Sequence, residues 1–497
     1  MTMNPPFVEF DEVHVISDLH LGGRPGFQMF GSTAELAWLI GDLRQRPAGR
    51  IALVINGDFV DFLAQAPALP FDPEGAADKL AAIANEPAFA PVFDALRAFT
   101  ATENRQLTVN LGNHDLEFAL PWVREALIEM LSRGNYVARG RIRLTLDGAG
   151  VLMRVGGARV LCVHGNEVDA WNVADYERIR RIGCDLMQGR GVEPWVPNGG
   201  SQLVSEVMNP LKQDYPFIDL LKPEAPAVFP MLVALQPSVV TQLGRFAAAV
   251  TRRSRDALRM ATGLLEEAAP QIGVPAAVAV AAPARGTARG AGMRVLRRER
   301  EEMARDLLDR AENSWRDELV PLDLISGDQR AEYLGMFGAL KQLVTSKGTT
   351  EALREALDGL DKDRSFDPSA EDDTYRDLDR LVGGDIDFLI AGHTHLERAL
   401  KRRRGRGFYF NSGTWARLIQ IPPQLRQDAQ GFAAAFKRMK AGTMEALDAE
   451  PSLTQRRCSV VSIWQESGAT LGELRRVAAA APAFAAVPVP GTRFSIN

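Results

Sequence analysis

Short apolar runs that stop abruptly at polar residues recur along the chain, and they constrain its fold more than any other feature. They are rich in Val, Ile and Leu, as buried strands are. Between the first three runs, residues 32–46 and 91–99 place apolar side chains at three- and four-residue spacing, which predicts helices. Alternating strands and helices predict an α/β fold. The five runs read EVHVIS, RIALVIN, RQLTVNL, RVLCVHG and IDFLIAG.

From residue 171 to residue 380 the pattern is mostly helical, which predicts an inserted region. This region holds a helical segment at 294–319 with charges of both signs, and an Ala-, Gly- and Pro-rich stretch at 268–292 that predicts a mobile loop. It is far longer than a connection between two strands requires. We expect the insertion to act as a lid, a specificity element or a surface for a partner.

Strands return after the insertion, which predicts one composite domain made of residues 1–170 and 381–480. A helical piece around 428–448 interrupts these later strands, and residues 481–497 predict an irregular tail. The later strands are expected at residues 407–415, 457–465 and 470–477.

Composition excludes several classes of protein. The 497 residues are 46% apolar and 24% charged, which is a globular balance. A net charge of −5 and a pI of about 5.9 give no overall electrostatic footprint for nucleic acid or an anionic membrane. Three scattered cysteines, Cys162, Cys184 and Cys458, predict a reducing compartment and no disulfide framework.

The first ten residues lack the basic region and apolar stretch of a secretory signal, so a cytoplasmic location is predicted. The most apolar window, residues 228–250, contains two prolines, two glutamines and Arg245, which argues against a transmembrane segment. A buried helix and a peripheral, membrane-surface helix both fit this window.

Each of the five apolar runs is followed by side chains that bind metals. In an open α/β sheet, ligands gather beyond the carboxyl ends of the strands, where all these side chains would meet. The chain has only six histidines, and five of them lie in these clusters, whereas His14 reads as an ordinary strand residue. The candidate residues are Asp18, His20, Asp58, Asp61, Asn113, His114, Asp115, His164, His393 and His395.

This mixture of carboxylates, imidazoles and an amide oxygen suits Mn²⁺, with Fe²⁺ and Zn²⁺ as alternatives. It exceeds what one ion needs, whereas two ions roughly 3.5–4 Å apart, bridged by a carboxylate and a hydroxide, would use the whole set. The adjacent glycines Gly57, Gly112, Gly165 and Gly392 permit sharp turns and close approach of the backbone.

The ordered blocks D-x-H, G-D-x-x-D, G-N-H-D, H-G and G-H-x-H resemble the calcineurin-like metallophosphoesterase family over about residues 10–170 and 383–420, together with the closing strands. The resemblance implies a fold of the α/β class, a two-layer β-sandwich flanked by helices, here with a large, mainly α-helical insertion. It also implies a dinuclear metal centre at one end of the sandwich.

The resemblance assigns roles to individual residues. Its first ion would be held by Asp18, His20, Asp58 and His395, and its second ion by Asp58, Asn113, His164 and His393, with Asp58 as the bridge. His114 is similar to a histidine that sits near the substrate phosphate, and Asp61 to the acid that orients it. The implied chemistry is in-line attack of a metal-bridging hydroxide on phosphorus, with a protonated His114 assisting the leaving oxygen.

Simpler interpretations compete for some of these residues. An acid such as Asp61, at a turn between a strand and a helix, is commonly a helix cap. The basic stretch 397–407 is more simply a solvated hairpin tip than a phosphate-attracting rim.

The substrate is less constrained than the reaction. The segments SDLHLGG, GDFVDF and HGNEVD are similar to the branch that contains the UDP-2,3-diacylglucosamine pyrophosphatase, but His114 stands where that branch carries arginine. We expect a phosphate-ester substrate with a phosphodiester or pyrophosphate bond. A nuclease or phosphomonoesterase of the same fold is the enzymatic alternative, and the acidic balance disfavours nucleic acid. A non-catalytic scaffold is the alternative of another class, which the intact ligand set opposes.

Overall fold

The structure is a computed structural model that describes residues 8–231 and 349–496 with short gaps. Within these ranges, residues 48, 170–171, 358–363, 442–443, 449–452 and scattered positions between 193 and 230 are not described. The predicted loop 268–292 and helix 294–319 lie outside the described residues, as does nearly all of the apolar window 228–250.

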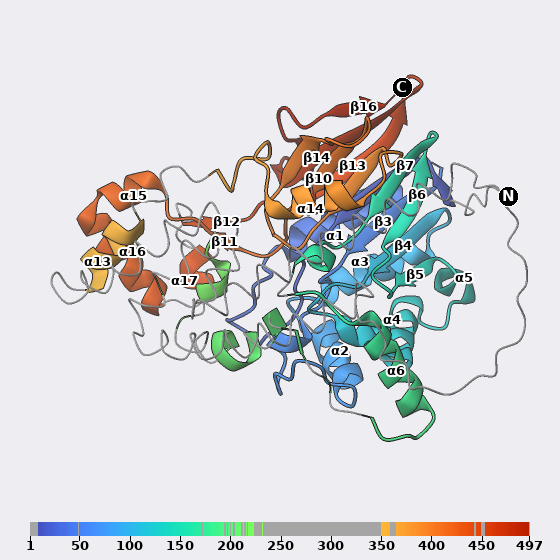
Figure 1. The fold of residues 1–497 in the computed structure, drawn as a ribbon, viewed down its shortest axis with the longest axis horizontal. Coiled ribbons are helices and arrows are strands. Elements are labelled where there is room, and N and C mark those ends of the chain that lie inside the picture. Colours follow the sequence, from blue (N-terminus) through green and yellow to red (C-terminus); the bar gives the residue numbers. More distant parts are fainter. Residues whose placement is uncertain are drawn as a thin grey trace, which may run out of the picture.

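Two sheets form the main body of the molecule (Figure 1). One has the strand order β1-β6-β7-β8-β10-β9, and the other has the order β15-β14-β13-β2-β3-β4-β5, with β16 also paired to β14. The first sheet contains β1 (Val8–Phe10), β6 (Val151–Val155), β7 (Ala158–Cys162), β8 (Phe388–Ala391), β9 (Arg398–Lys401) and β10 (Phe408–Asn411). The second contains β2 (Glu12–Ile16), β3 (Ile51–Asn56), β4 (Arg105–Asn110), β5 (Ile142–Thr145), β13 (Ser459–Glu466), β14 (Ala469–Ala480), β15 (Ala483–Pro488) and β16 (Phe494–Ile496).

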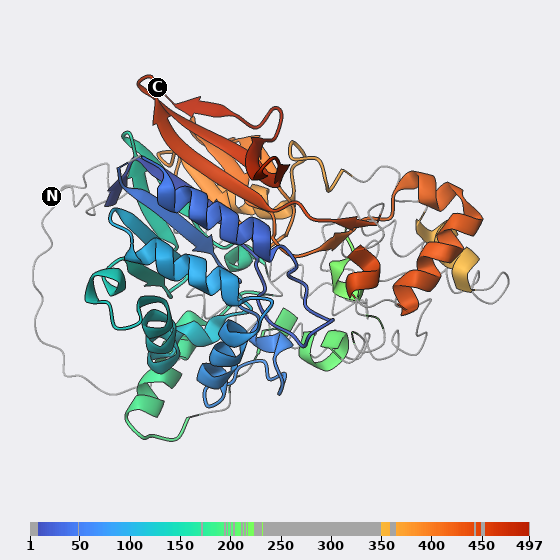
Figure 2. The same ribbon diagram turned by 180° about the vertical axis from the view of Figure 1, so that it is seen from behind.

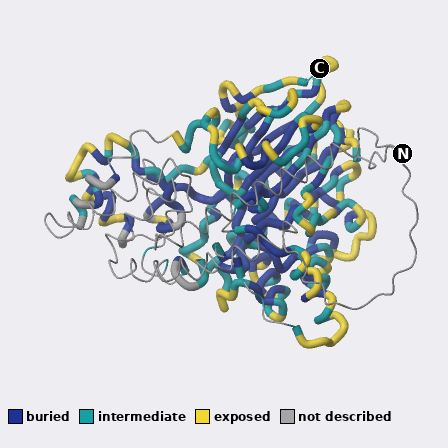
Figure 3. The backbone as a smooth tube through the Cα atoms, in the orientation of Figure 1, coloured by how far each residue is buried: buried dark blue, intermediate teal, exposed yellow. Residues whose placement is uncertain are grey.

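The two sheets pack face to face, as the alternation along β3 shows. Ala52 and Val54 join an apolar cluster that includes Val160, Phe388 and Phe410 of the other sheet. The residues between and beside them, Ile51, Leu53 and Ile55, point to the opposite face and join the cluster made with the helices. Both faces of β3 are therefore buried, which is why its sequence is continuously apolar. The predicted sandwich flanked by helices is confirmed, and buried residues follow its central strands (Figure 3).

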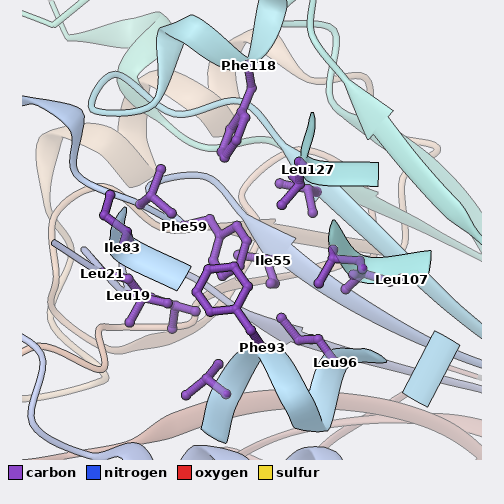
Figure 4. Packing of buried hydrophobic residues seen from close by; sticks show 14 of the residues in the cluster. Leu19, Leu21, Ile55, Phe59, Ile83, Phe93, Leu96, Leu107, Phe118 and Leu127 are labelled. Atoms are coloured by element: carbon purple, nitrogen blue, oxygen red, sulfur yellow. The ribbon is translucent and has the colours of Figure 1, made fainter. Parts of the chain in front are cut away.

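Helices cover the outer face of the second sheet. In α1 (Thr33–Gln45) the buried residues Leu36, Leu39, Ile40 and Leu43 repeat at helical spacing. Figure 4 shows how Phe93 and Leu96 of α3 (Ala90–Ala101) pack with Ile55 and Phe59. The other helices of this layer are α2 (Ala76–Asn85), α4 (Pro121–Ser132), α5 (Tyr136–Arg139) and α6 (Tyr176–Met187).

A second apolar core lies outside the sandwich and changes the predicted domain boundaries. Phe217 and Leu221 of the insertion share this core with Phe432, Phe436 and Met439 of α16. The helical piece that we expected within the composite domain 381–480 therefore packs with the insertion (Figures 1 and 2). This body contains α13 (Thr349–Leu357), α15 (Pro423–Gln427), α16 (Ala429–Ala441), α17 (Met444–Asp448), β11 (Leu418–Ile419) and β12 (Thr454–Gln455).

Conversely, two helices inside the range 171–380 pack on the sandwich. Ile179 and Ile182 of α6 belong to the apolar cluster of the outer helices. Tyr375 and Leu378 of α14 (Asp373–Leu381) pack with Tyr409 of β10. The boundary at residue 171 and the one at residue 380 are therefore wrong by one helix each, because an apolar helix face does not reveal from sequence which core it enters.

The predicted irregular tail 481–497 is also wrong. β15 pairs antiparallel with β14 from Ala483 to Pro488, and β16 pairs with the same strand. Ala- and Pro-rich segments have low strand propensity, but pairing uses backbone groups, and Pro488 stands at the end of an edge strand, where proline is tolerated.

Among the helices that the structure describes, none combines the length and the apolar character that a membrane crossing requires.

Candidate metal centre

Five strands deliver the candidate ligands to one end of the sandwich. Asp18 and His20 follow β2, and Asp58 follows β3 after a single glycine. The parallel pairing of β2, β3 and β4 places their carboxyl ends side by side. In the other sheet β7 and β8 are also parallel, and they lead into His164 and His393. The expected convergence of side chains from both sheets is thus observed.

The backbone at these residues is unusual for side-chain-bearing positions. The φ angles are 53° at Asp18, 47° at His20, 52° at Asp58, 71° at His393 and 63° at His395. Left-handed backbone is uncommon outside glycine and clusters where a site over-determines the conformation. Five strained candidates at one end of a sandwich indicate that this end is built for a function.

The candidates for the first ion point at one another. His20 Nε2 lies 3.0 Å from His395 Nε2, and His395 Nε2 lies 3.4 Å from Asp18 Oδ1. These two nitrogens are within hydrogen-bonding distance, and in their unprotonated forms they would face a shared cation. Among the described residues, Asp18, His20 and His395 form one of three groups whose possible ligand atoms all lie within 4.8 Å of one another.

Asp58 lies between the two sets. Its Oδ2 is 3.3 Å from His164 Nε2 and 3.6 Å from His20 Nε2, so one carboxylate faces candidates for both ions. Asp58 and Asp18 also form a group with His164. Burial opposes ionisation of Asp58, but the charge of His164 and then that of His114 outweigh it and hold the pKa of Asp58 well below the usual range.

Two buried donor atoms of the second set fit a metal ion. His164 donates from Nδ1 to the Asn56 carbonyl at 2.8 Å, so Nε2 is the nitrogen that faces the site and would bind a metal once it has lost its proton. His164 Nε2 and Asn113 Oδ1 are both buried and have no hydrogen-bond partner among the described residues. Buried polar atoms are nearly always satisfied, so a cation shared by these two atoms would fit here.

His393 is placed beside this set but is turned partly away from it. Its ring centroid lies 5.4 Å from that of His164, and its Nε2 lies 2.8 Å from Asp169 Oδ2. Asp169 and its neighbour Asn172 were not predicted as site residues. The only signal for them is their position, five and eight residues after His164 in HGNEVDAWN.

Asp61 contacts two histidines with its two oxygens. Oδ1 lies 3.3 Å from His114 Nδ1, and Oδ2 lies 3.6 Å from His20 Nδ1. The same carboxylate also accepts a hydrogen bond from the backbone of Ala64, so the simpler interpretation as a cap is true as well. Burial lowers the pKa of His114, but the charges of Asp61 and Asp58 more than offset this and raise it to about 9.

Two glycines allow the close packing that the site requires. A Cβ on Gly57, whose φ is 88°, would lie 2.1 Å from His164 Nδ1. A Cβ on Gly112 would lie 2.1 Å from Asp58 Oδ1. Neither position tolerates a side chain, as the sequence predicted for glycines beside the ligands.

The insertion is attached to the segment that follows Asp61 and to β11 of the second core. Asn209 donates from its side chain to the Leu63 carbonyl at 3.0 Å, two residues after Asp61. Lys222 donates from its backbone to the Ile419 carbonyl at 2.9 Å. The Lys222 side chain is fully buried. Burial of His395 is the main cause that holds the pKa of His395 well below the usual range, and the charge of Lys222 is the next cause.

The basic stretch 397–407 forms the hairpin of β9 and β10, as expected. However, Arg398 and Arg402 are buried, and each pairs with an aspartate: Arg398 Nε lies 2.8 Å from Asp372 Oδ2, and Arg402 Nε lies 2.8 Å from Asp379 Oδ1. These two cations hold α14 to the sheet, so they are neither a solvated tip nor a free phosphate rim.

Comparison with known proteins gives one family match. Residues 12–218 match the family described as calcineurin-like phosphoesterase. The matched region contains every candidate up to His164 and ends before His393 and His395. A search of curated proteins found no similar sequence.

Proposed function

Because residues 12–218 belong to the calcineurin-like phosphoesterase family, we propose that the protein is a metal-dependent hydrolase that cleaves a phosphodiester or pyrophosphate bond. The observation that carries the proposal is the pair of buried, unsatisfied ligand atoms, His164 Nε2 and Asn113 Oδ1, beside the carboxylate of Asp58. Such a pair has no function in a fold that serves only as a scaffold, because each unmet group costs about 1–3 kcal/mol.

The first ion would be held by Asp18, His20, Asp58 and His395, and the second by Asp58, Asn113, His164 and His393. A pair of divalent ions supplies an activated water at neutral pH and neutralises charge on the phosphate oxygens. Mn²⁺ is the metal that we expect, since the set mixes carboxylate, imidazole and amide ligands.

His114 is the residue that we assign to the leaving group. Its pKa of about 9 keeps the ring protonated at neutral pH, and Asp61 holds Nδ1 at 3.3 Å. A ring fixed in this way can donate a proton from Nε2 to a leaving oxygen. Asp61 itself acts as a positioning residue.

A phosphodiester or pyrophosphate substrate is favoured over a simple monoester by the position of the insertion. Asn209 is attached to Leu63, two residues after Asp61, and the charge of Lys222 acts on His395, so these residues of the insertion would contact a second group carried by the phosphate. The charge of Lys212, from the same segment, acts on His114.

The test is a turnover panel of the full chain loaded with Mn²⁺. It compares p-nitrophenyl phosphate, bis(p-nitrophenyl) phosphate, a nucleotide-sugar diphosphate and single-stranded DNA. We expect the diester or the diphosphate to be hydrolysed fastest, and Asp58→Asn to abolish turnover while leaving the melting temperature near that of the native protein. Asp78→Asn, at an exposed position in the first turn of α2, is the matched control and should keep full activity. The absence of turnover with every divalent metal would refute the proposal.

A further inference from the structure

A continuous chain of hydrogen bonds joins two candidate ligands of the second ion through residues that the family blocks do not include. His393 Nε2 lies 2.8 Å from Asp169 Oδ2. Asn172 donates from Nδ2 to the same oxygen at 2.6 Å. The Oδ1 of Asn172 in turn accepts from Asn113 Nδ2 at 3.4 Å. The hydrogen bonds therefore run from His393 through Asp169 and Asn172 to Asn113, and they link two candidate ligands of the second ion.

These contacts select which atoms remain for a metal. An ionised carboxylate only accepts, so Nε2 of His393 carries the proton and Nδ1 carries the lone pair. In Asn113 the amide nitrogen is engaged, so Oδ1 is the atom left over, and it is buried without a hydrogen-bond partner among the described residues. The Asp169–Asn172 pair thus fixes the tautomer of one side chain and the amide orientation of the other.

The loop that carries the pair is held in place by its own backbone. Val173 donates to the Asp169 carbonyl at 2.8 Å, and Asp169 donates to the Asn166 carbonyl at 3.1 Å. The side chain of Asn166 donates to the Asn172 carbonyl at 3.1 Å. Asp169 and Asn172 are therefore positioned by local structure as well as by their contacts with the candidate ligands.

We propose that Asp169, together with Asn172, positions His393 and Asn113 for the second ion and sets the affinity for that ion without touching the first; this rests on the proposed two-ion function. Outer partners of metal-binding histidines change metal affinity by about 10–100-fold when they are removed. The first set has its own contacts, since His20 and His395 face each other and Asp61 lies next to His20.

The test is binding of Mn²⁺ alone to the full chain, measured by titration calorimetry and by the electron paramagnetic resonance spectrum, which distinguishes coupled from isolated Mn²⁺. We expect two ions in the native protein. In Asp169→Asn the affinity for the second ion should fall about 10–100-fold, and the affinity for the first ion should not change. The protein should then give the electron paramagnetic resonance spectrum of isolated Mn²⁺. Asp175→Asn is the matched control, because Asp175 caps α6 in the same segment and accepts from Arg178 at 2.9 Å. Since asparagine caps a helix about as well as aspartate, this variant should keep a near-native melting temperature and leave both ions bound.

Asn172→Ala provides a second variant if Asp169→Asn does not fold, and it should also weaken the second ion selectively. The inference would be overturned if folded Asp169→Asn bound two ions with native affinity. If only Asn172→Ala folds, the same result in Asn172→Ala would overturn it. Loss of both ions together would overturn it too. A native protein that binds two ions and hydrolyses nothing would instead refute the proposed function and leave this inference standing.

Discussion

The carboxylate of Asp61 lies 3.3 Å from His114 Nδ1 through one oxygen and 3.6 Å from His20 Nδ1 through the other, so a single acid links the predicted proton donor to a candidate ligand of the first ion. The two histidine rings are in edge-to-face contact, with centroids 4.8 Å apart. His20, Asp61 and His114 also have possible ligand atoms within 4.8 Å of one another, so the metal content of a His114 variant distinguishes a ligand from a proton donor.

His114→Gln should lower kcat by about 10²–10⁴-fold, because glutamine fills similar space but cannot deliver a proton to a leaving oxygen. The metal content should stay at two ions, since His114 is not in either ligand set. Steady-state kinetics and metal analysis on the same preparation check this. Loss of an ion from the folded variant would show that His114 is a ligand, contrary to its assignment.

Gly57→Ala should destabilise the protein severely and remove the second ion. The alanine Cβ would lie 2.1 Å from His164 Nδ1, in a backbone conformation with a φ of 88°. The matched control is Gly189→Ala, where φ is 66° and nothing lies within 4 Å of the added carbon. The control should lose about 1–2 kcal/mol from backbone strain alone. Equal losses for both variants in urea unfolding would mean that the contact with His164 has no effect.

Glu117 should make folding less favourable as the pH rises. Burial is the main cause that raises its pKa from 4.5 to about 8, and backbone hydrogen bonds only partly oppose it. Between these values the unfolded chain has released the proton while the folded chain keeps it, so stability declines with rising pH and reaches its minimum above about 8. One pKa unit corresponds to about 1.4 kcal/mol.

In Glu117→Gln the free energy of unfolding should therefore fall less between pH 5 and pH 8 than in the native protein. The difference between the two falls should be at most several times about 1.4 kcal/mol. Glutamine can still accept the hydrogen bond from the Asp72 backbone, which measures 3.0 Å. Glu129→Gln, on the exposed face of α4, is the control and should follow the native curve. Parallel curves for Glu117→Gln and the native protein would contradict a raised pKa.

Phe217→Ala should affect the second core and spare the sandwich. The side chain is fully buried in the cluster that contains Phe432 and Met439 of α16, and loss of a buried phenylalanine costs about 3–5 kcal/mol. Hydrogen exchange should become faster in α16 and stay unchanged in β3. Phe93→Ala should give the reverse pattern, because Phe93 packs with Ile55 in the other core. Faster exchange in β3 after Phe217→Ala would show that the two cores unfold together.

The site was more predictable from sequence than the organisation around it. Buried parallel strands are continuously apolar, so β2, β3, β4, β7 and β8 were recognisable, and metal-binding residues at their ends marked where the chains converge. Asp169 was not recognisable, because an acid in a loop shows its role only through the contact with His393. The left-handed backbone at Asp18 and His20 is only weakly indicated by residue type, since aspartate and histidine adopt it more often than other side-chain-bearing residues but still rarely.

The errors in the fold share a physical cause. α6 and α16 each bury an apolar face, yet one packs on the sandwich and the other on the second core. The pattern predicts that a face is buried but not which partner buries it. In β15, pairing depends on the exposed backbone of β14, a property of the partner strand that the Ala- and Pro-rich sequence of 483–488 does not carry.

The most direct measurement is turnover of bis(p-nitrophenyl) phosphate by the native chain as a function of Mn²⁺ bound per molecule, starting from protein stripped of metal with a chelator. A centre built around the shared carboxylate of Asp58 predicts little turnover with one ion and full turnover once the second is bound. Turnover that survives complete removal of metal, or that reaches its maximum with a single ion, would contradict it.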